Sequence, residues 1–205
     1  MGFKKYLISI LKYISLLRQI IETQSTQNPI TFRLWFFQKV IGFNRKCYWP
    51  VHHSSVVNNP EYIYIGIDSS PGYMNGCYIQ GSGKIYIGNY VQIGPNVGII
   101  SSNHSLYDSR ESEPKPVVIG DYCWLAMGVT VMPGVILGPH VTVGSGAVVT
   151  KSFESGYCVI AGNPAKKIKD LDPTLCVNYE NDYKYHGYLS EKKYLQRIYI
   201  NGNNS

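Results

Sequence analysis

The sequence contains little cysteine, and the spacing of its cysteines does not indicate a disulfide framework. Cys47, Cys77, Cys123, Cys158 and Cys176 are the only five among 205 residues, and no two of them form a CxxC pair. Three histidines with metal-ligand spacing are also absent. Because an odd and widely spaced set of cysteines suits a reducing compartment, we expect free thiols, no metal ion and a cytoplasmic protein.

A long uninterrupted hydrophobic run is absent as well. Residues 4–22 carry a periodic apolar face, but Lys12 and Arg18 interrupt the stretch. A spanning helix needs about 20 apolar residues, and a signal peptide would need a small-residue cleavage site after an unbroken apolar core. We therefore predict an amphipathic helix that packs on the protein or on a neighbouring subunit. The alternative is weak contact with a membrane surface through residues 4–22, which would make the protein peripheral at the inner membrane.

Charged residues are scarce, at 16% of the chain, and the net charge is +6. The basic residues are spread out instead of forming one stripe or patch. This distribution does not favour nucleic acid as a partner.

The chain does contain a six-residue repeat. Aliphatic residues occupy its first position at Ile87, Ile93, Ile99, Ile119, Leu125, Val131, Leu137, Val143 and Val149. Small or β-branched residues occupy the fifth position at Val129, Val135, Val141 and Ala147. A unit this short must stack on copies of itself to bury its apolar side. The repeat predicts a mainly β fold, a parallel β-helix in which three hexads form one triangular coil and the first and fifth positions point inward. Cys77 and Cys123 fall within this frame and are expected in the core.

The predicted frame extends upstream and is interrupted once. Ile67, Tyr73, Ile79 and Ile85 continue the fifth positions, with irregular first positions at Ser69, Asn75 and Gly81. The interval from Ile99 to Ile119 is not a multiple of six, and the residues at about 105–118 are polar and include two prolines. We predict a loop extruded from one corner of the coil, and such loops on rigid scaffolds commonly carry function.

Three segments within residues 63–169 resemble the hexapeptide-repeat acyltransferases. They are Ile93-Gly94-Pro95-Asn96-Val97 with Ser101-Ser102-Asn103-His104, then Ile119-Gly120-Asp121-Tyr122-Cys123-Trp124, and Val143–Lys151 leading to Ala161-Gly162-Asn163-Pro164-Ala165-Lys166. The likeness is to bacterial O-acetyltransferases that act on galactosides, maltose, xenobiotics and capsular polysaccharides. It implies a left-handed coil, a homotrimer with active sites between subunits, and acetyl-CoA as donor.

We expect three parts along the chain. Residues 1–62 form a helical segment and connector that caps the coil, 63–169 form the left-handed β-helix acyltransferase domain, and 170–205 form a tail. A second short helix is predicted at residues 32–41. The sequence of the tail predicts either a helix over 190–200, with Leu195 and Ile198 on one face, or a strand across 198–200. His52 and His53 are expected to point different ways and to be structural, and His140 is expected in a solvated corner without a role.

Acetyl transfer to a hydroxyl needs a base, and histidine titrates near neutrality. His104 lies where the coil meets the loop and matches the catalytic position of the family. Asn103 is a candidate to orient His104 or the acceptor, and Asp108 is a candidate to bind a sugar. The chain has no Ser or Cys in a nucleophile motif, so direct attack without a covalent acyl-enzyme is expected.

The resemblance also implies a donor site. Trp124 matches a tryptophan beside the reaction centre, and Ala126, Met127 and Ser145 match positions along the pantetheine arm. Thr150, Lys151, Lys166 and Lys169 match the nucleotide end. Some relatives have arginine in place of the last two lysines, and a smaller polar residue in place of Met127.

The acceptor is expected against the early coils, near Tyr73, Asn75 and Tyr78. The favoured function is O-acetylation of a carbohydrate hydroxyl, in bacterial surface polysaccharide biosynthesis. Alternatives are N-acetylation of an amino sugar, acetylation of a small molecule such as serine, and a non-catalytic trimeric scaffold.

Overall fold

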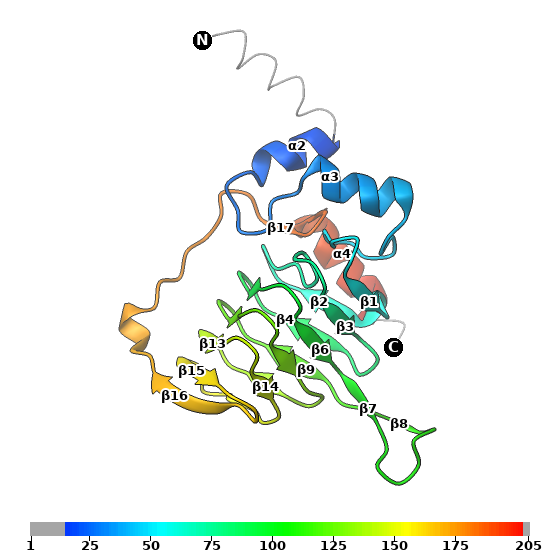
Figure 1. The fold of residues 1–205 in the computed structure, drawn as a ribbon. Coiled ribbons are helices and arrows are strands. Elements are labelled where there is room, and N and C mark those ends of the chain that lie inside the picture. Colours follow the sequence, from blue (N-terminus) through cyan, green and yellow to red (C-terminus); the bar gives the residue numbers. More distant parts are fainter. Residues whose placement is uncertain (1–14, 203–205) are drawn as a thin grey trace.

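A computed structural model describes residues 15–202, with side chains as far as Tyr199. The chain forms a triangular coil of short parallel strands, with helical segments gathered at its N-terminal end (Figure 1). The three sides of the coil are three sheets. From β3 to β14, apart from the β7–β8 hairpin, consecutive strands fall on the three sheets in turn.

Each sheet is named here by its strands. Sheet A consists of β1 (Val56–Asn58), β3 (Tyr78–Gln80), β6 (Gly98–Ile100), β11 (Thr130–Val131) and β14 (Val148–Val149). Sheet B consists of β2 (Ile63–Ile65), β4 (Ile85–Ile87), β9 (Val117–Ile119) and β12 (Ile136–Leu137). Sheet C consists of β5 (Gln92–Ile93), β10 (Trp124–Leu125), β13 (Val141–Val143), β15 (Cys158–Ala161) and β16 (Lys166–Asp170). Within these three sheets all strand pairs are parallel except β15 with β16, the pair that ends the coil.

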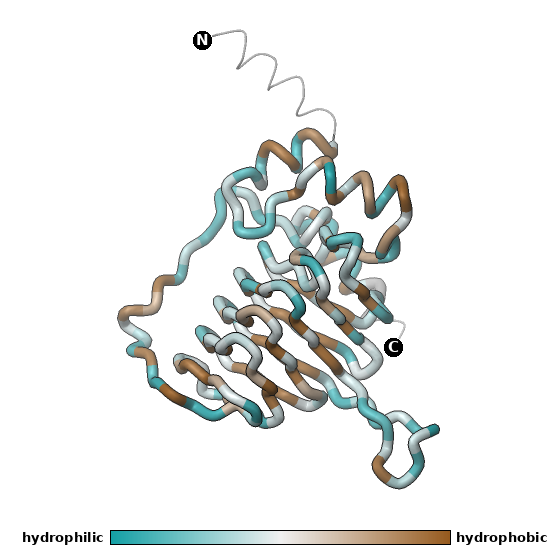
Figure 2. The backbone as a smooth tube through the Cα atoms, viewed as in Figure 1, coloured by the Kyte–Doolittle hydropathy of each residue, from teal (hydrophilic) through white to brown (hydrophobic). Residues whose placement is uncertain are grey.

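The core is a column of aliphatic side chains from the three sheets. Leu125, Val143 and Ile160 from sheet C are completely buried, as are Val131 and Val149 from sheet A. Apolar residues therefore follow the strands, while the corners are polar (Figure 2). Burial of one such side chain contributes about 1.5–3 kcal/mol, so no hexad is stable alone. The predicted fold class is confirmed: the protein is a left-handed parallel β-helix.

The predicted phase of the early repeat is wrong. Ile79 pairs with Ile99 and therefore occupies a first position, not a fifth. The first position of the next strand is Ile87, which pairs with Ile119. The turn between β3 and β4 thus holds two more residues than a hexad allows. An even number of extra residues keeps the same side chains pointing inward, since the strand repeats every two residues.

One hairpin leaves the coil at the corner between sheets A and B. It is formed by β7 (Ser102–His104) and β8 (Ser112–Pro114), which pair antiparallel. The chain leaves the coil after β6 and returns at β9, and the hairpin projects outward from that corner (Figure 1). The predicted extruded loop is therefore present, and it begins at Ser102.

The helical segment before the coil contains α2 (Ser15–Glu22), α3 (Phe32–Trp35) and a π-helical turn (Phe36–Ile41). The predicted short helix over 32–41 is confirmed, with Thr31 as its N-cap. The predicted helix over 4–22 is seen only from Ser15, because its first part lies outside the described residues. None of the helices within residues 15–202 combines the length and hydrophobicity needed to cross a membrane. The first strand of the coil begins at Val56, inside the segment assigned to the connector.

The tail returns to the N-terminal end of the coil, where β17 (Tyr185–His186) and β18 (Leu189–Ser190) precede α4 (Glu191–Gly202). The predicted C-terminal helix is confirmed, and the alternative strand across 198–200 is wrong. Leu195 was expected on the packed face but is exposed, whereas Tyr194 is buried and stacks on His186 at 3.7 Å between ring centroids. The packed face is therefore formed by Tyr194 and Ile198.

A ladder of rings lines the corner between sheets B and C. Tyr90, Tyr122, His140 and Tyr157 all have left-handed backbone conformations and stack in sequence at 4.9–5.2 Å. Residues 176–182, called the strap below, run along this ladder (Figure 1). His140 lies at this corner, where its ring stacks between Tyr122 and Tyr157 and its Nε2 lies 2.8 Å from Asn178 Oδ1, so the contacts that it makes here are structural. Each ring supports the next, and the strap binds several coils together.

Candidate active site

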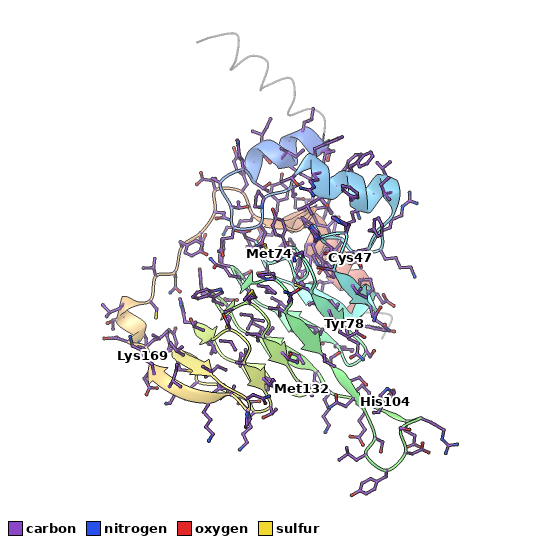
Figure 3. The ribbon with its side chains drawn as sticks, in the orientation of Figure 1. Cys47, Met74, Tyr78, His104, Met132 and Lys169 are labelled. Carbon is purple, nitrogen blue, oxygen red and sulfur yellow. The ribbon has the colours of Figure 1, made fainter. Side chains whose placement is uncertain are left out.

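His104 lies at the root of the β7–β8 hairpin, on the last residue of β7 (Figure 3). Asn103 precedes it and pairs with Glu113, while His104 pairs with Ser112. Both side chains are exposed, and among residues 15–199 neither has a hydrogen-bond partner. The imidazole is thus fixed to a rigid corner through its backbone while both ring nitrogens remain available to a substrate.

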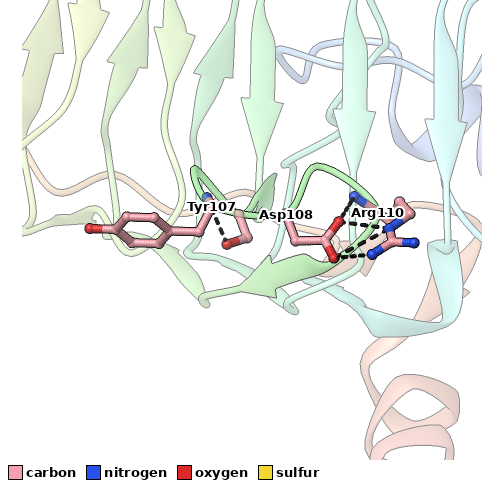
Figure 4. A network of polar contacts seen from close by, with 4 residues as sticks. Tyr107, Asp108 and Arg110 are labelled. Atoms are coloured by element: carbon pink, nitrogen blue, oxygen red, sulfur yellow. Dashed lines mark hydrogen bonds and ion pairs between the residues drawn. The ribbon is translucent and has the colours of Figure 1, made fainter.

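Asp108 is engaged within the hairpin loop. Its carboxylate accepts hydrogen bonds from the backbone N–H and the guanidinium of Arg110, with a shortest distance of 2.6 Å from Nη2 to Oδ2 (Figure 4). These hydrogen bonds hold the pKa of the Asp108 carboxyl below its usual range. Neighbouring Tyr107 is completely exposed at the tip of the loop. Asp108 therefore shapes the loop, and a sugar would compete with Arg110 for it.

Trp124 lies on sheet C in an outward row with Gln92 and Thr142. Its side chain is 50% exposed. It borders a cavity of 320 Å³ that also contains Gln27, Asn28, Tyr73 and Gln92. An indole face beside several amide groups suits a ligand that has both an apolar face and hydroxyl groups.

His104 and Trp124 do not meet within one chain. His104 follows sheet A and sits at the A–B corner, whereas Trp124 is on sheet C. The predicted donor residues divide in the same way. Ala126, Met127 and Ser145 follow sheet C at the C–A corner, where the Gly146 N–H donates to the Met127 carbonyl at 2.9 Å. Thr150 and Lys151 follow β14 and lead into the A–B corner, the corner that carries His104.

The lysines assigned to the nucleotide end are all exposed. Lys166 and Lys169 lie on β16, on the side of the coil away from the hairpin (Figure 3). Lys167 pairs with Asp170 at 2.6 Å. Within the described part of the chain, Lys151, Lys166 and Lys169 have no ion-pair partner, so their charges remain available to phosphates.

The three predicted acceptor residues lie in different surroundings. Tyr73 is half-buried, donates its hydroxyl to the Pro29 carbonyl at 3.0 Å, and lines two adjoining cavities. Asn75 lines the second of these. Tyr78 is on sheet A, where its hydroxyl accepts a hydrogen bond from Asn58 Nδ2, and it lines neither cavity.

The sequence analysis missed Gln27 and Asn28, which line the cavity beside Trp124. Asp68 holds them there: its buried carboxylate accepts the backbone N–H of both residues at 3.0 Å and the Asn181 amide at 2.9 Å. A repeated pattern could have identified Asp68. It occupies the ladder position, two residues after a glycine, as do Tyr90, Tyr122 and His140.

A larger cavity of 530 Å³ lies elsewhere, on the outer side of sheet B. It is bordered by the stacked rings of Tyr64 and Tyr86 and by Tyr194 of α4. None of the predicted site residues lines it, so size alone does not identify the active site here.

Comparisons with known proteins agree with this architecture. Residues 116–151 match the family described as bacterial transferase hexapeptide (six repeats). A galactoside O-acetyltransferase of Lactococcus lactis is 38% identical over 95 residues, which cover 43% of this chain and 45% of that protein. The galactoside O-acetyltransferase of Escherichia coli is 32% identical over 104 residues, covering 49% of this chain and 51% of that protein. The chain thus spans about half the length of these curated relatives.

Among solved structures, a maltose O-acetyltransferase from Clostridium difficile superposes with a TM-score of 0.54. The two chains are 24% identical, and the superposition covers 81% of this chain and 89% of the other. At this identity the likeness supports the fold. The six-residue repeat and the triangular coil thus agree with the match of residues 116–151 to the hexapeptide transferase model, and over this part of the coil the chain is similar to that family.

Proposed function

We propose that this protein transfers an acetyl group from acetyl-CoA to a carbohydrate hydroxyl, with His104 as general base. The observation that carries the proposal is the position of His104, an exposed imidazole without a partner among the described residues, at the root of a hairpin on a rigid coil. A neutral imidazole can accept the hydroxyl proton as the oxygen attacks the thioester carbonyl. The proton can then pass to the departing thiolate, so no covalent enzyme intermediate is needed.

The proposed site is completed by a second copy of the chain. His104, Thr150 and Lys151 belong to the A–B corner, whereas Trp124, Met127 and Ser145 belong to sheet C and the C–A corner. If one copy's A–B corner faces the next copy's sheet C, the two sets form one groove. Repeating the contact around a threefold axis gives a closed homotrimer with three equal sites.

Acetyl-CoA would lie along this groove. The thioester would reach Trp124, the pantetheine arm would follow the backbone at Ala126, Met127 and Ser145, and the phosphates would lie near the lysines and Thr150. Ammonium groups attract phosphates without requiring a fixed geometry. Lys151, Lys166 and Lys169 are exposed and have no ion-pair partner among residues 15–199, which supports this assignment.

The acceptor would lie in the cavity beside Trp124, with Tyr73, Gln27 and Gln92 around it. The relatives named as galactoside O-acetyltransferases support a sugar as acceptor. A bacterial surface polysaccharide or its precursor is the acceptor that we propose for the cell, and the cytoplasm is the proposed compartment.

The proposal is tested with acetyl-CoA and a panel of methyl glycosides, following thiol release and identifying products by NMR. Ester products and one bound acetyl-CoA per subunit of a trimer are expected, from calorimetry and light scattering. The panel includes a methyl glycoside of an amino sugar, and an amide as its product would reject O-acetylation. A folded trimer that does not bind acetyl-CoA would reject the enzyme and leave the scaffold.

A further inference from the structure

A second cavity, of 330 Å³, adjoins the one beside Trp124, and Tyr73 and Met74 line both. Its other polar groups come from the helical segment and the start of the coil: Thr31, Arg33, His52, His53 and Asn75. No aspartate or glutamate lines it. A concave site with three basic side chains and no carboxylate is suited to an anion.

The two histidines lie together, contrary to the sequence analysis. Their ring centroids are 4.1 Å apart, and His53 also stacks on Phe37 at 4.8 Å. Nδ1 of His52 accepts the Ser54 N–H at 3.2 Å and lies 2.8 Å from the Ser54 hydroxyl. The Ser54 contacts fix this ring through Nδ1, so Nε2 remains as its free nitrogen.

Arg33 lies on α3 and is exposed. Among residues 15–199 no carboxylate pairs with its guanidinium. Burial lowers the pKa of His52, and the charges of His53 and Arg33 lower it further. The positive charges of Arg33 and His53 therefore disfavour protonation of His52, and a bound anion would favour it.

We infer that this cavity binds an anionic substituent, a carboxylate or a phosphate ester, on the carbohydrate whose ring occupies the adjoining cavity beside Trp124. The guanidinium supplies a charged, bidentate donor, and the imidazoles and the Asn75 amide supply further N–H groups. A neutral sugar would leave these donors unsatisfied. The identification of the ligand as the acceptor rests on the proposed function, but anion binding can be measured without turnover.

The test measures binding by calorimetry with three probes: methyl galactoside, methyl galacturonide and galactose 6-phosphate. We expect at least one anionic probe to bind about 10-fold more tightly than the neutral glycoside, a difference of about 1.4 kcal/mol. The tighter of the two anionic probes identifies the substituent. Arg33→Gln should remove the preference. Arg45→Gln, which changes an exposed arginine outside the cavity, should leave it intact.

A pH series distinguishes the cavity from unspecific attraction to a basic protein. The charged or titratable residues that line the cavity with His52 are Arg33 from α3, His53 from its own turn and Tyr73. Binding of the anion should take up a proton, so affinity should rise as pH falls from 8 to 6, and His52→Gln should flatten this dependence. Equal binding of all three probes, or a preference that survives Arg33→Gln, would overturn the inference. Tight anion binding with no acetyl transfer to any probe would instead overturn the proposed function.

Discussion

The coils between β9 and β14 repeat every 18 residues, as Thr130 pairing with Val148 shows, whereas the N-terminal coils are longer. Val56 pairs with Tyr78 across 22 residues, and Tyr78 pairs with Gly98 across 20. The regular coils stack identical corners and leave a straight track of backbone at Ala126, Met127 and Ser145. Two of the extra residues lie in the turn between β3 and β4, which lines neither cavity, and two more lie between Ile65 and Ile79, the stretch that supplies Tyr73 and Asn75 to the cavities. We propose that the regular coils hold the donor and that this irregular stretch holds the acceptor.

The largest expected effect comes from His104, where the coil changes from long to regular turns. His104→Ala should lower turnover about 10²–10⁴-fold, because the acceptor hydroxyl loses its base. Acetyl-CoA affinity, measured by calorimetry, should be nearly unchanged. A collapse of donor affinity would show that His104 is structural.

Glycines at corners where successive coils stack closely should tolerate added volume least. In Gly120→Ala the new Cβ would lie 2.6 Å from the Gly138 carbonyl carbon in the next coil, whereas in Gly98→Ala the nearest atoms are at 3.7 Å. We expect Gly120→Ala to lower the free energy of unfolding by about 1–3 kcal/mol. Gly98→Ala should be neutral or slightly stabilising. Thermal denaturation of both variants checks this, and equal melting temperatures would contradict tight stacking at Gly120.

The affinity for acetyl-CoA should depend on the positive charges of the lysines proposed to bind its phosphates. Lys151→Ala and Lys166→Ala should each weaken acetyl-CoA binding about 5–10-fold, with less change in turnover at saturating donor. Lys46→Ala, in the connector, is the matched control. Loss of turnover with unchanged donor affinity would remove these lysines from the nucleotide site.

The smallest effect concerns the N-terminal end, where His186 packs under Tyr194. Burial lowers the pKa of His186, so the folded state favours the neutral ring. This contribution is complete above the unfolded pKa of about 6.5 and is lost as pH falls from there through the lowered folded value. Melting temperatures from pH 8 to 5 should fall more steeply for the wild type than for His186→Gln. His104→Ala, which removes an exposed imidazole, should keep the wild-type slope.

Part of the arrangement could be predicted, because a hexad repeat fixes which residues share a corner. The 18-residue spacing stacks Met127 on Ser145. Trp124 lies over Gln92 across 32 residues, which is not a multiple of six, so this contact also requires the hairpin to leave and re-enter the coil at one corner. The phase upstream of Ile85 could not be predicted, because two extra residues in a turn preserve the inward pattern and leave no mark in the alternation. The ring contact between His52 and His53 was not predicted, because the rule that adjacent side chains point to opposite faces holds in a strand but not in a turn.

The coil, its one large excursion at His104 and the polarity of its corners could be read from the sequence, because each follows from local periodicity and local breaks in it. Which distant segments meet depends on the folded chain. The Asp68 carboxylate, in the first coil, joins Gln27 and Asn28 to Asn181 of the strap by accepting hydrogen bonds from two backbone N–H groups and two side-chain amides that no period connects. The cavities depend on those contacts, because they form where the helical segment, the early turns and sheet C come together.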